Sequence, residues 1–317
     1  LNIIDIQNGN VIYKAAEHIA KNVKVHPNAS ITLHNEAKVS LDKANLVDNA
    51  QIVFDNSRAT YLHANTLGQG NIIKRGNGTS YLSGDLLHRG KTDIQSGGLS
   101  VNGVIHNSPV YVHSDAALGG SGEIKSDVTL YEQAVISPTI SANPSSFTPN
   151  SLSLNNIKNY GGSVLLHVLN KGESVAQWQH DRLLIKGNVE SETPIPVNLQ
   201  MLSSTQGISD KNNNGQYDAD EGISLIQVKG SANLAQFVLN KALGLSRSDI
   251  YQYALVSVDK QATVATENKF GENNSDYYDY RLQTLLVNEN GESPEAVIRY
   301  VEPTSNTADT ATKTATT

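Results

Sequence analysis

The sequence predicts an all-β solenoid, a column in which coils of short strands stack on one another. Short runs that alternate apolar and polar residues recur along the chain. Each run is bounded by Asn, Asp or Gly, which is typical of strands joined by tight turns. One such run returns about 21 residues later, the length of one solenoid coil.

The composition agrees with strands and polar turns, and it limits the chemistry. The 317 residues are 38% hydrophobic and 17% charged, with a net charge of −7 and no cysteine. Disulfides, thiolate zinc sites and cysteine nucleophiles are therefore excluded. A pI near 5.7 argues against nucleic acid as a partner, because a basic face is expected there. No apolar run reaches the roughly 18 residues that span a bilayer.

The first third contains the repeat. Residues 28–33 (NASITL) return, with changes, as residues 49–54 (NAQIVF), and residues 163–168 (SVLLHV) alternate in the same way. We expect the first two runs to lie side by side in neighbouring coils. A sandwich or barrel remains the alternative, because a strand run near every ten residues fits either architecture.

Two short stretches have helical spacing instead. These are residues 13–21 and residues 233–244, where Leu234, Phe237, Val238 and Leu243 fall near one helix face.

The densest pattern is residues 73–103. Gly76 and Gly78 flank Asn77, which allows a turn with positive φ before a strand at residues 79–82. The segment resembles the autotransporter-associated β-strand repeat, and the turn at residues 118–122 (LGGSG) continues it. The matching positions are Lys74, Gly76, Gly78, Thr79, Leu82, Ser83, Gly84, Gly98, Leu99, Val101, Asn102 and Gly103.

A second resemblance covers residues 161–189, which are similar to pertactin-like autotransporter passengers. The positions that carry it are Asp181, Leu183, Ile185, Gly187 and Val189. Residues 223–230, 251–256 and 278–282 also match, and the sequences of these segments most resemble those of Bartonella autotransporter passengers. One group of those acts as an angiogenic factor that stimulates endothelial growth-factor receptors.

These resemblances imply an architecture and a location. The fold would be a right-handed parallel β-helix from about Asn10 to Leu282, ending in a C-terminal aromatic cap region. Residues 1–160 would form the first coils and residues 161–300 a pertactin-like segment with one inserted loop. Residues 301–317 would be a disordered linker tail. The chain would be a mature or excised fragment, secreted to the cell surface and tied to a membrane only through a barrel that this sequence lacks.

Residues 210–221 (DKNNNGQYDADE) satisfy the calcium-loop pattern D-x-[DN]-x-[DN]-G-x5-E. Calcium prefers six to eight hard oxygen ligands, and Gly215 permits the sharp bend between them. We expect a Ca²⁺ loop inserted between strands, although a polar turn without metal is the plainer reading. The positions that would supply oxygens are Asp210, Asn212, Asn214, Gln216, Asp218 and Glu221.

A basic ridge is the second candidate site. Neighbouring coils could stack Lys74 and Arg75 against His88, Arg89 and Lys91 to bind a receptor or glycan. The ordinary alternative is a solvated face.

No catalytic motif stands out. The histidines show no H-x-x-x-H or H-E-x-x-H spacing, and no serine lies in a G-x-S-x-G elbow. We therefore expect a non-enzymatic virulence factor that binds a host cell-surface receptor or matrix component. A β-helical polysaccharide lyase or hydrolase, and a structural stalk for a missing N-terminal module, are the alternatives, since solenoid enzymes gather carboxylates from different coils.

Overall fold

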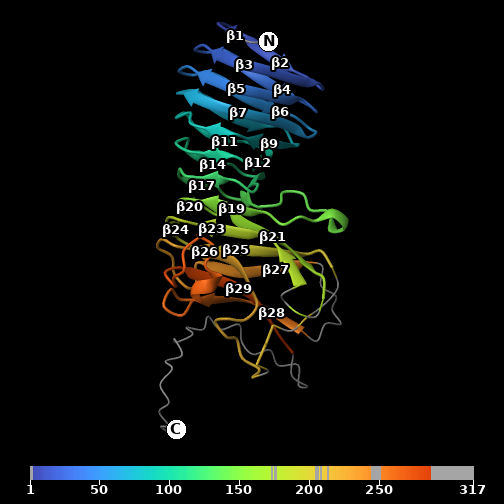
Figure 1. Ribbon diagram of the computed structural model, residues 1–317, viewed down its shortest axis with the longest axis vertical. Coiled ribbons are helices and arrows are strands. Elements are labelled where there is room, and N and C mark those ends of the chain that lie inside the picture. Colours follow the sequence, from blue (N-terminus) through green and yellow to red (C-terminus); the bar gives the residue numbers. More distant parts are fainter. Residues whose placement is uncertain are drawn as a thin grey trace.

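The computed structural model describes residues 3–172, 174, 177–203, 207, 209–212, 214–243 and 251–286. These residues form an elongated column of stacked strands, with the N-terminal coil at one end (Figure 1). Each coil as far as residue 191 gives one strand to a nine-stranded sheet, and the coils give one or two strands each to a twenty-stranded sheet. The parallel β-solenoid predicted from the repeat is confirmed.

The nine-stranded sheet is parallel throughout, because consecutive coils place each strand beside its counterpart in the next coil. Its strands are β2 (Asn10–Tyr13), β4 (Ser30–His34), β6 (Gln51–Asp55), β8 (Asn71–Arg75), β11 (Thr92–Ile94), β14 (Val110–Val112), β17 (Val128–Leu130), β20 (Ile157–Asn159) and β24 (Val189–Ser191).

The larger sheet wraps the remaining sides of the coils. Its N-terminal strands are β1 (Ile3–Ile6), β3 (Glu17–Val25), β5 (Lys38–Leu46), β7 (Thr60–Gly68), β9 (Thr79–Ser83), β10 (Asp85–Leu86), β12 (Gly97–Val101), β13 (Val104–Ile105), β15 (Ala116–Gly119), β16 (Glu123–Ile124) and β18 (Val135–Ile136). It continues with β19 (Ser151–Leu154), β21 (Ser163–Asn170), β22 (Trp178–His180), β23 (Arg182–Ile185), β25 (Ile195–Met201), β26 (Ile223–Val228), β27 (Phe237–Leu243), β28 (Tyr251–Val258) and β29 (Tyr278–Leu286).

The sequence repeat marks two stacked coils. Ser30 pairs with Gln51 and Ile31 with Ile52, in parallel register. Asn28 and Asn49 begin the repeat and have φ values of 63° and 61°. Asn tolerates this left-handed conformation better than most residues, so it serves at the corner of each coil.

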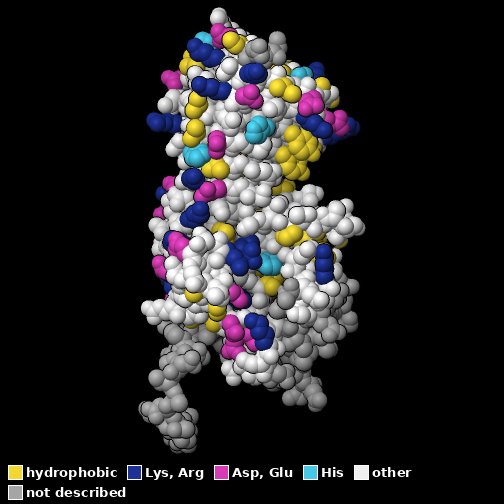
Figure 2. Space-filling view, viewed as in Figure 1, with side chains coloured by type: hydrophobic (Ala, Val, Ile, Leu, Met, Phe, Trp, Pro, Cys, Tyr) yellow, Lys and Arg dark blue, Asp and Glu magenta, His cyan; other side chains and the backbone are white. Residues whose placement is uncertain are grey.

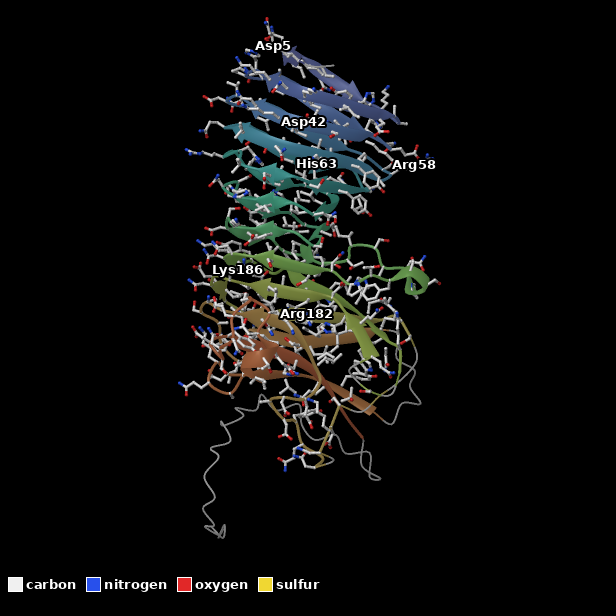
Figure 3. All side chains as sticks on the ribbon, viewed as in Figure 1. Asp5, Asp42, Arg58, His63, Arg182 and Lys186 are labelled. Atoms are coloured by element: carbon white, nitrogen blue, oxygen red, sulfur yellow. The ribbon has the colours of Figure 1, made fainter. Side chains whose placement is uncertain are left out.

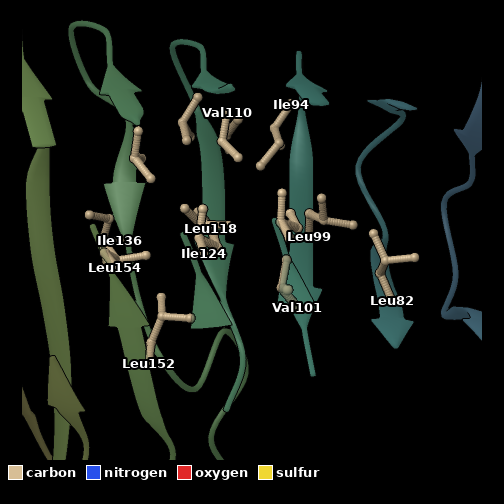
Figure 4. Packing of buried hydrophobic residues seen from close by; sticks show 14 of the residues in the cluster. Leu82, Ile94, Leu99, Val101, Val110, Leu118, Ile124, Ile136, Leu152 and Leu154 are labelled. Atoms are coloured by element: carbon tan, nitrogen blue, oxygen red, sulfur yellow. The ribbon is translucent and has the colours of Figure 1, made fainter. Parts of the chain in front are cut away.

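The main core is one largely aliphatic column inside the coils. Leu99 lies beside Leu118, and Leu118 beside Ile136, so that like side chains stack from coil to coil (Figure 4). All three are 0% exposed. Burying each such side chain contributes about 1.5–3 kcal/mol, and the column is continuous. Because every coil needs its neighbours to cover this column, stability builds up along the chain.

The parallel stacking continues past residue 160 and ends near the C-terminal strands. β20 pairs with β24 and β18 with β21 across that boundary. Beyond it, β29 runs antiparallel to both β26 and β28. Among the described residues, the other antiparallel pair joins β21 and β22, so the sandwich and barrel alternatives are excluded. Residues 287–317, and with them the predicted linker tail, lie outside the described residues.

Both helical predictions were wrong. Residues 13–21 run from the end of β2 into β3, and residues 237–243 form β27. β27 pairs with β25 in the growing sheet, and that pairing outweighs the local helical spacing. Helical structure in the described residues includes the 3-10 turns η1 (Pro144–Ser146) and η3 (Ala265–Glu267). Within the described part of the chain, no helix has the length and apolar character required to cross a membrane.

Candidate functional site

The predicted calcium loop lies between β25 and β26 and bends at Gly215, which has a φ of +69°. The two carboxylate oxygens of Asp210 accept hydrogen bonds from the backbone N–H groups of Asn214 (3.1 Å) and Gly215 (2.8 Å). The side-chain amides of Asn212 and Asn214 both donate to Asp218 Oδ2, at 2.8 and 2.9 Å. The structure therefore brings four of the six predicted ligand positions around one turn.

The other two positions differ in burial. Gln216 is exposed, with its N–H bonded to Asn214 Oδ1 at 2.8 Å. Glu221 is 1% exposed. Burial raises the pKa of Glu221, and so do the charges of Asp210 and Asp218. No group of three His, Cys, Asp or Glu side chains among the described residues has metal-site spacing, so Asn amides and a backbone carbonyl would have to complete a site.

The prediction of a basic surface ridge is wrong for two of its five residues, Lys74 and His88, because both are buried. Lys74 is 0% exposed, and its ammonium donates to the carbonyl oxygens of Arg75, Gly76 and Ser96 at 2.9, 2.6 and 3.1 Å. Burial lowers the pKa of Lys74 to about 8, an effect that Asp55 opposes. The Lys74 ammonium therefore stabilises a corner of the coil and is not accessible to a binding partner.

His88 also lies inside the column, at 0% exposed. Its ring nitrogens bond to Thr66 Oγ1 (2.9 Å) and Thr92 Oγ1 (3.3 Å). Burial lowers the pKa of His88 to about 4, so the ring is neutral at physiological pH. It cannot contribute positive charge to the surface.

The remaining three basic residues are exposed but do not form a ridge. Arg75 pairs with Asp55 at 3.1 Å, and Lys91 pairs with Asp93 at 2.9 Å. Arg75 ends β8, whereas the N–H of Lys91 bonds to Asn71 at the start of the same strand. A strand of this length separates Arg75 from Lys91 and Arg89 by about 13 Å.

A different surface, which we call the tyrosine groove, lies on the outer face of β3, β5, β7 and β9. It is a hollow of about 560 Å³ whose lining includes Lys38, Tyr61, His63 and Tyr81. The parallel register places Lys38 beside Tyr61 and Tyr61 beside Tyr81. Figure 2 shows hydrophobic side chains gathered on this flank, above the loop that projects from the column, and Figure 3 marks His63 on the same part of the molecule.

Ring stacking within the groove leaves one face of Tyr81 for other contacts. The rings of Tyr61 and Tyr81 stack with centroids 4.9 Å apart and an interplanar angle of 10°. The opposite face of Tyr81 therefore looks toward the next coil, where its register partner is Ser100. Because Ser100 is small and 5% exposed, it forms a floor without filling the space beside the ring.

A second hollow of about 270 Å³, which we call the slot, occupies that space. Tyr81 forms one wall, Ser100 the floor, and residues 139–150 the other wall. Residues 139–150 form the loop that projects from the side of the column in Figure 1. We call this loop the arm. The slot lining includes five polar residues of the arm, Ser141, Asn143, Ser146, Thr148 and Asn150. Two of their amide atoms already bond within the arm region, because Asn143 Oδ1 accepts from the N–H of Ser145 and Asn150 Nδ2 donates to the carbonyl of Pro138, each at 3.0 Å. The arm begins after β18 and contains η1.

Both ends of the arm are fastened by one buried carboxylate. Asp181 is 0% exposed and accepts hydrogen bonds from Thr139 Oγ1 (2.7 Å) and from the N–H of Asn150 (3.0 Å). Its second oxygen is held by the ring and the N–H of His167, at 2.9 and 3.1 Å. The slot is thus built on rigid elements before any ligand arrives.

Close packing beneath the arm adds to this rigidity. Gly119 is required there, because a Cβ at that position would lie 2.0 Å from Ser137 O and 2.8 Å from Ile140 Cγ1. Phe147 of the arm is 8% exposed and packs near the His167 ring, with centroids 6.2 Å apart.

The lining of the tyrosine groove is mainly apolar, whereas that of the slot is mainly polar. In the groove, Glu17 and Lys38 have opposite charges, and His63 Nδ1 lies 3.1 Å from Ser83 Oγ. The slot lining combines Ser, Thr and Asn residues with the Tyr81 ring and the apolar side chains of Ile140, Ala142 and Phe147. Burial raises the pKa of Tyr81, with a smaller contribution from Tyr61, so its hydroxyl stays protonated.

Sequence reasoning missed the tyrosine groove, although a signal was present. Tyr61 and Tyr81 are 20 positions apart, which is one coil, so writing the sequence coil by coil would have aligned them. Comparison with family models and with curated proteins gives no significant match. The parallel β-solenoid is consistent with the resemblance to pertactin-like passengers.

Proposed function

We propose that this chain is a secreted binding protein of the autotransporter-passenger type, and that its slot holds a neutral sugar unit of a glycan on a host cell surface or matrix component. The observation that carries the proposal is the free ring face of Tyr81, which lies opposite the polar arm across the slot.

The chemistry of a sugar ring suits this arrangement. One face of a pyranose presents C–H groups, which pack against an aromatic π face, while its hydroxyls need donors and acceptors around the rim. Tyr81 would supply the aromatic face, and Ser100, Asn143 and Asn150 the polar contacts. A strongly charged ligand is disfavoured, because no Lys, Arg, Asp or Glu of the described residues lines the slot.

Binding is favoured over glycan cleavage. Hydrolysis of a glycosidic bond generally requires two carboxyl groups that flank the bond. Within the described part of the chain, Glu17 is the one carboxylate that lines the tyrosine groove, and the slot lining adds none. His63 and Ser83 form a hydrogen-bonded pair, but no carboxylate among the described residues is hydrogen-bonded to that histidine.

Screening the purified chain against an array of immobilised neutral and acidic glycans tests the proposal. We expect binding to neutral glycans, which soluble oligosaccharide of the same kind inhibits. Tyr81→Ala should weaken the affinity about tenfold, since loss of an aromatic contact costs about 1.4 kcal/mol. Tyr81→Phe keeps the ring and should bind nearly as well as the parent.

Tyr160→Ala is the matched control. Tyr160 is also an exposed tyrosine, 63% exposed, and it stacks on Tyr131 away from the groove. Its loss should leave glycan binding unchanged. The proposal is wrong if no glycan binds the parent chain, or if Tyr81→Ala binds as tightly as the parent while both are folded.

A further inference from the structure

The loop of residues 210–221, which the proposed glycan binding does not use, contains a buried oxygen that lacks a partner. Glu221 Oε1 accepts a hydrogen bond from the N–H of Lys211 at 2.7 Å. The N–H of Asn212 also lies near this carboxylate, but Oε2 is buried and no described residue makes a hydrogen bond of normal geometry with it. A buried carboxylate oxygen without a partner costs stability, so a positive ligand at this point would be favourable.

The two basic side chains near Glu221, those of Lys211 and Arg281, bind other oxygens. The ammonium of Lys211 donates to the carbonyl of Asp220 and lies 4.0 Å from the exposed Asp220 carboxylate. The guanidinium of Arg281 pairs with the carboxylates of Asp279 and Glu267. Among the described residues, neither of these cations pairs with the Glu221 carboxylate.

Other oxygens lie on the same turn, and the carboxylates of Asp210, Asp218 and Glu221 must draw closer together than in this structure to share one ion. Asp210 and Asp218 both act on Glu221 as nearby negative charges. The amide nitrogens of Asn212 and Asn214 currently hold Asp218. Rotating each amide by half a turn would present its oxygen in place of its nitrogen, at the expense of the hydrogen bonds that these oxygens accept from the N–H groups of Asn214 (3.0 Å) and Gln216 (2.8 Å). The donor set is then made of hard oxygens around a sharp bend, as calcium prefers.

We propose that this loop binds one Ca²⁺ and that the ion locks the loop onto β29. The ligands are side-chain oxygens of five residues and the backbone carbonyl of Gln216; the five are Asp210, Asn212, Asn214, Asp218 and Glu221. Glu221 closes the site with both carboxylate oxygens, which gives its buried Oε2 a partner.

The connection to β29 runs through the backbone of the ligand residues. The carbonyl of Asp218 accepts from Gln283 Nε2 at 2.6 Å, and the carbonyl of Glu221 accepts from Arg281 Nε at 2.7 Å. Arg281 Nη2 also donates to the carbonyl of Gly222 at 3.2 Å. Ordering the loop around an ion therefore orders the last antiparallel strand of the column, which pairs with β26 and β28.

Calorimetric titration of the whole chain with CaCl₂, and with MgCl₂ for comparison, tests the site. We expect one Ca²⁺ site with a Kd of roughly 10⁻⁴ to 10⁻³ M and weaker binding of Mg²⁺, which demands stricter geometry. Glu221→Gln and Asp210→Asn should each abolish the binding heat. Asp220→Asn, a change of the exposed acidic neighbour in the same loop, should bind as the parent does.

Thermal unfolding separates a metal ligand from a structural residue. If the Kd is about 1 mM, Ca²⁺ at about 10 mM should raise the folding equilibrium constant of the parent about tenfold. Glu221→Gln should gain nothing from Ca²⁺, and without Ca²⁺ it should be at least as stable as the parent, because it removes an uncompensated buried charge. Absence of binding heat in the parent, or equal binding by Glu221→Gln, would overturn the proposal. Either outcome leaves the glycan proposal standing, because the slot is built from other coils.

Discussion

His88 should make the column sensitive to mild acid. The ring is 0% exposed and is hydrogen-bonded to two threonine hydroxyls, Thr66 and Thr92. Burial lowers its pKa to about 4. In the unfolded chain the ring is in water, with an ordinary pKa near 6.5. As the pH falls, the unfolded chain therefore takes up a proton before the folded protein does.

The size of the effect follows from these two pKa values. The contribution of neutral His88 to stability is fully present above about pH 6.5 and is lost as the pH falls toward about 4. Between about pH 7 and pH 5 the loss is about 2 kcal/mol, which is a large share of the stability of an ordinary domain.

Urea unfolding midpoints measured across this pH range would test the prediction. The parent also carries other titrating groups, so the informative quantity is the free energy of unfolding of the parent minus that of His88→Gln at each pH. That difference should shrink by about 2 kcal/mol as the pH falls, because Gln does not take up a proton. His34→Gln, a change of an exposed histidine, should follow the parent. Parallel curves for the parent and His88→Gln would refute the assignment of a buried neutral ring.

Two further predictions concern the backbone of the coils and their C-terminal end. Gly120→Ala should lower the free energy of unfolding in urea by at least about 2 kcal/mol, because Gly120 has a φ of +113° and a Cβ there would lie 2.0 Å from a carbonyl oxygen of the neighbouring coil. As a control, Gly271→Ala, at a φ of +84° with no atom within 4 Å, should cost only about 1 kcal/mol. Equal losses for the two variants would contradict the close approach at Gly120. Arg281→Gln should destabilise the protein by about 3–5 kcal/mol, since it leaves Asp279, which is 1% exposed, without its ion pair. As a control, Arg58→Gln breaks the exposed ion pair with Glu36 and should cost under about 1 kcal/mol. An equally small loss for Arg281→Gln would contradict the prediction that its ion pair with Asp279 is buried from water.

Local sequence patterns were enough to predict the column but not its surface. The returning run of residues 28–33 and 49–54 identified two stacked strands, because both the aliphatic positions and the corner Asn repeat with the coil. Residues 237–243 misled the prediction, since a strand that pairs with a neighbour does not need a strict alternation of its own. Pairing partners that are distant in sequence decide such segments.

The basic ridge failed for a related reason. Lys74 occupies the end of a strand, where a long side chain turned inward reaches three carbonyl oxygens of the corner. Whether a lysine turns inward depends on free acceptors within reach, and a single strand does not show them. The arm was also beyond local patterns, because Asp181 fastens Thr139 and Asn150 from more than thirty positions away. The calcium-type loop was visible because its ligands come from one continuous segment.

The two proposed sites should act independently because of the way a solenoid is built. Each coil contacts mainly its neighbours, so free energy gained at one coil spreads only a short way along the column. The slot lies on the coils of β9 and β12 and is closed by the arm. The loop of residues 210–221 instead contacts β29, at the far end of the stacked strands. A change that removes both glycan binding and Ca²⁺ binding would therefore indicate general unfolding of the column, whereas loss of one alone locates the defect in that site.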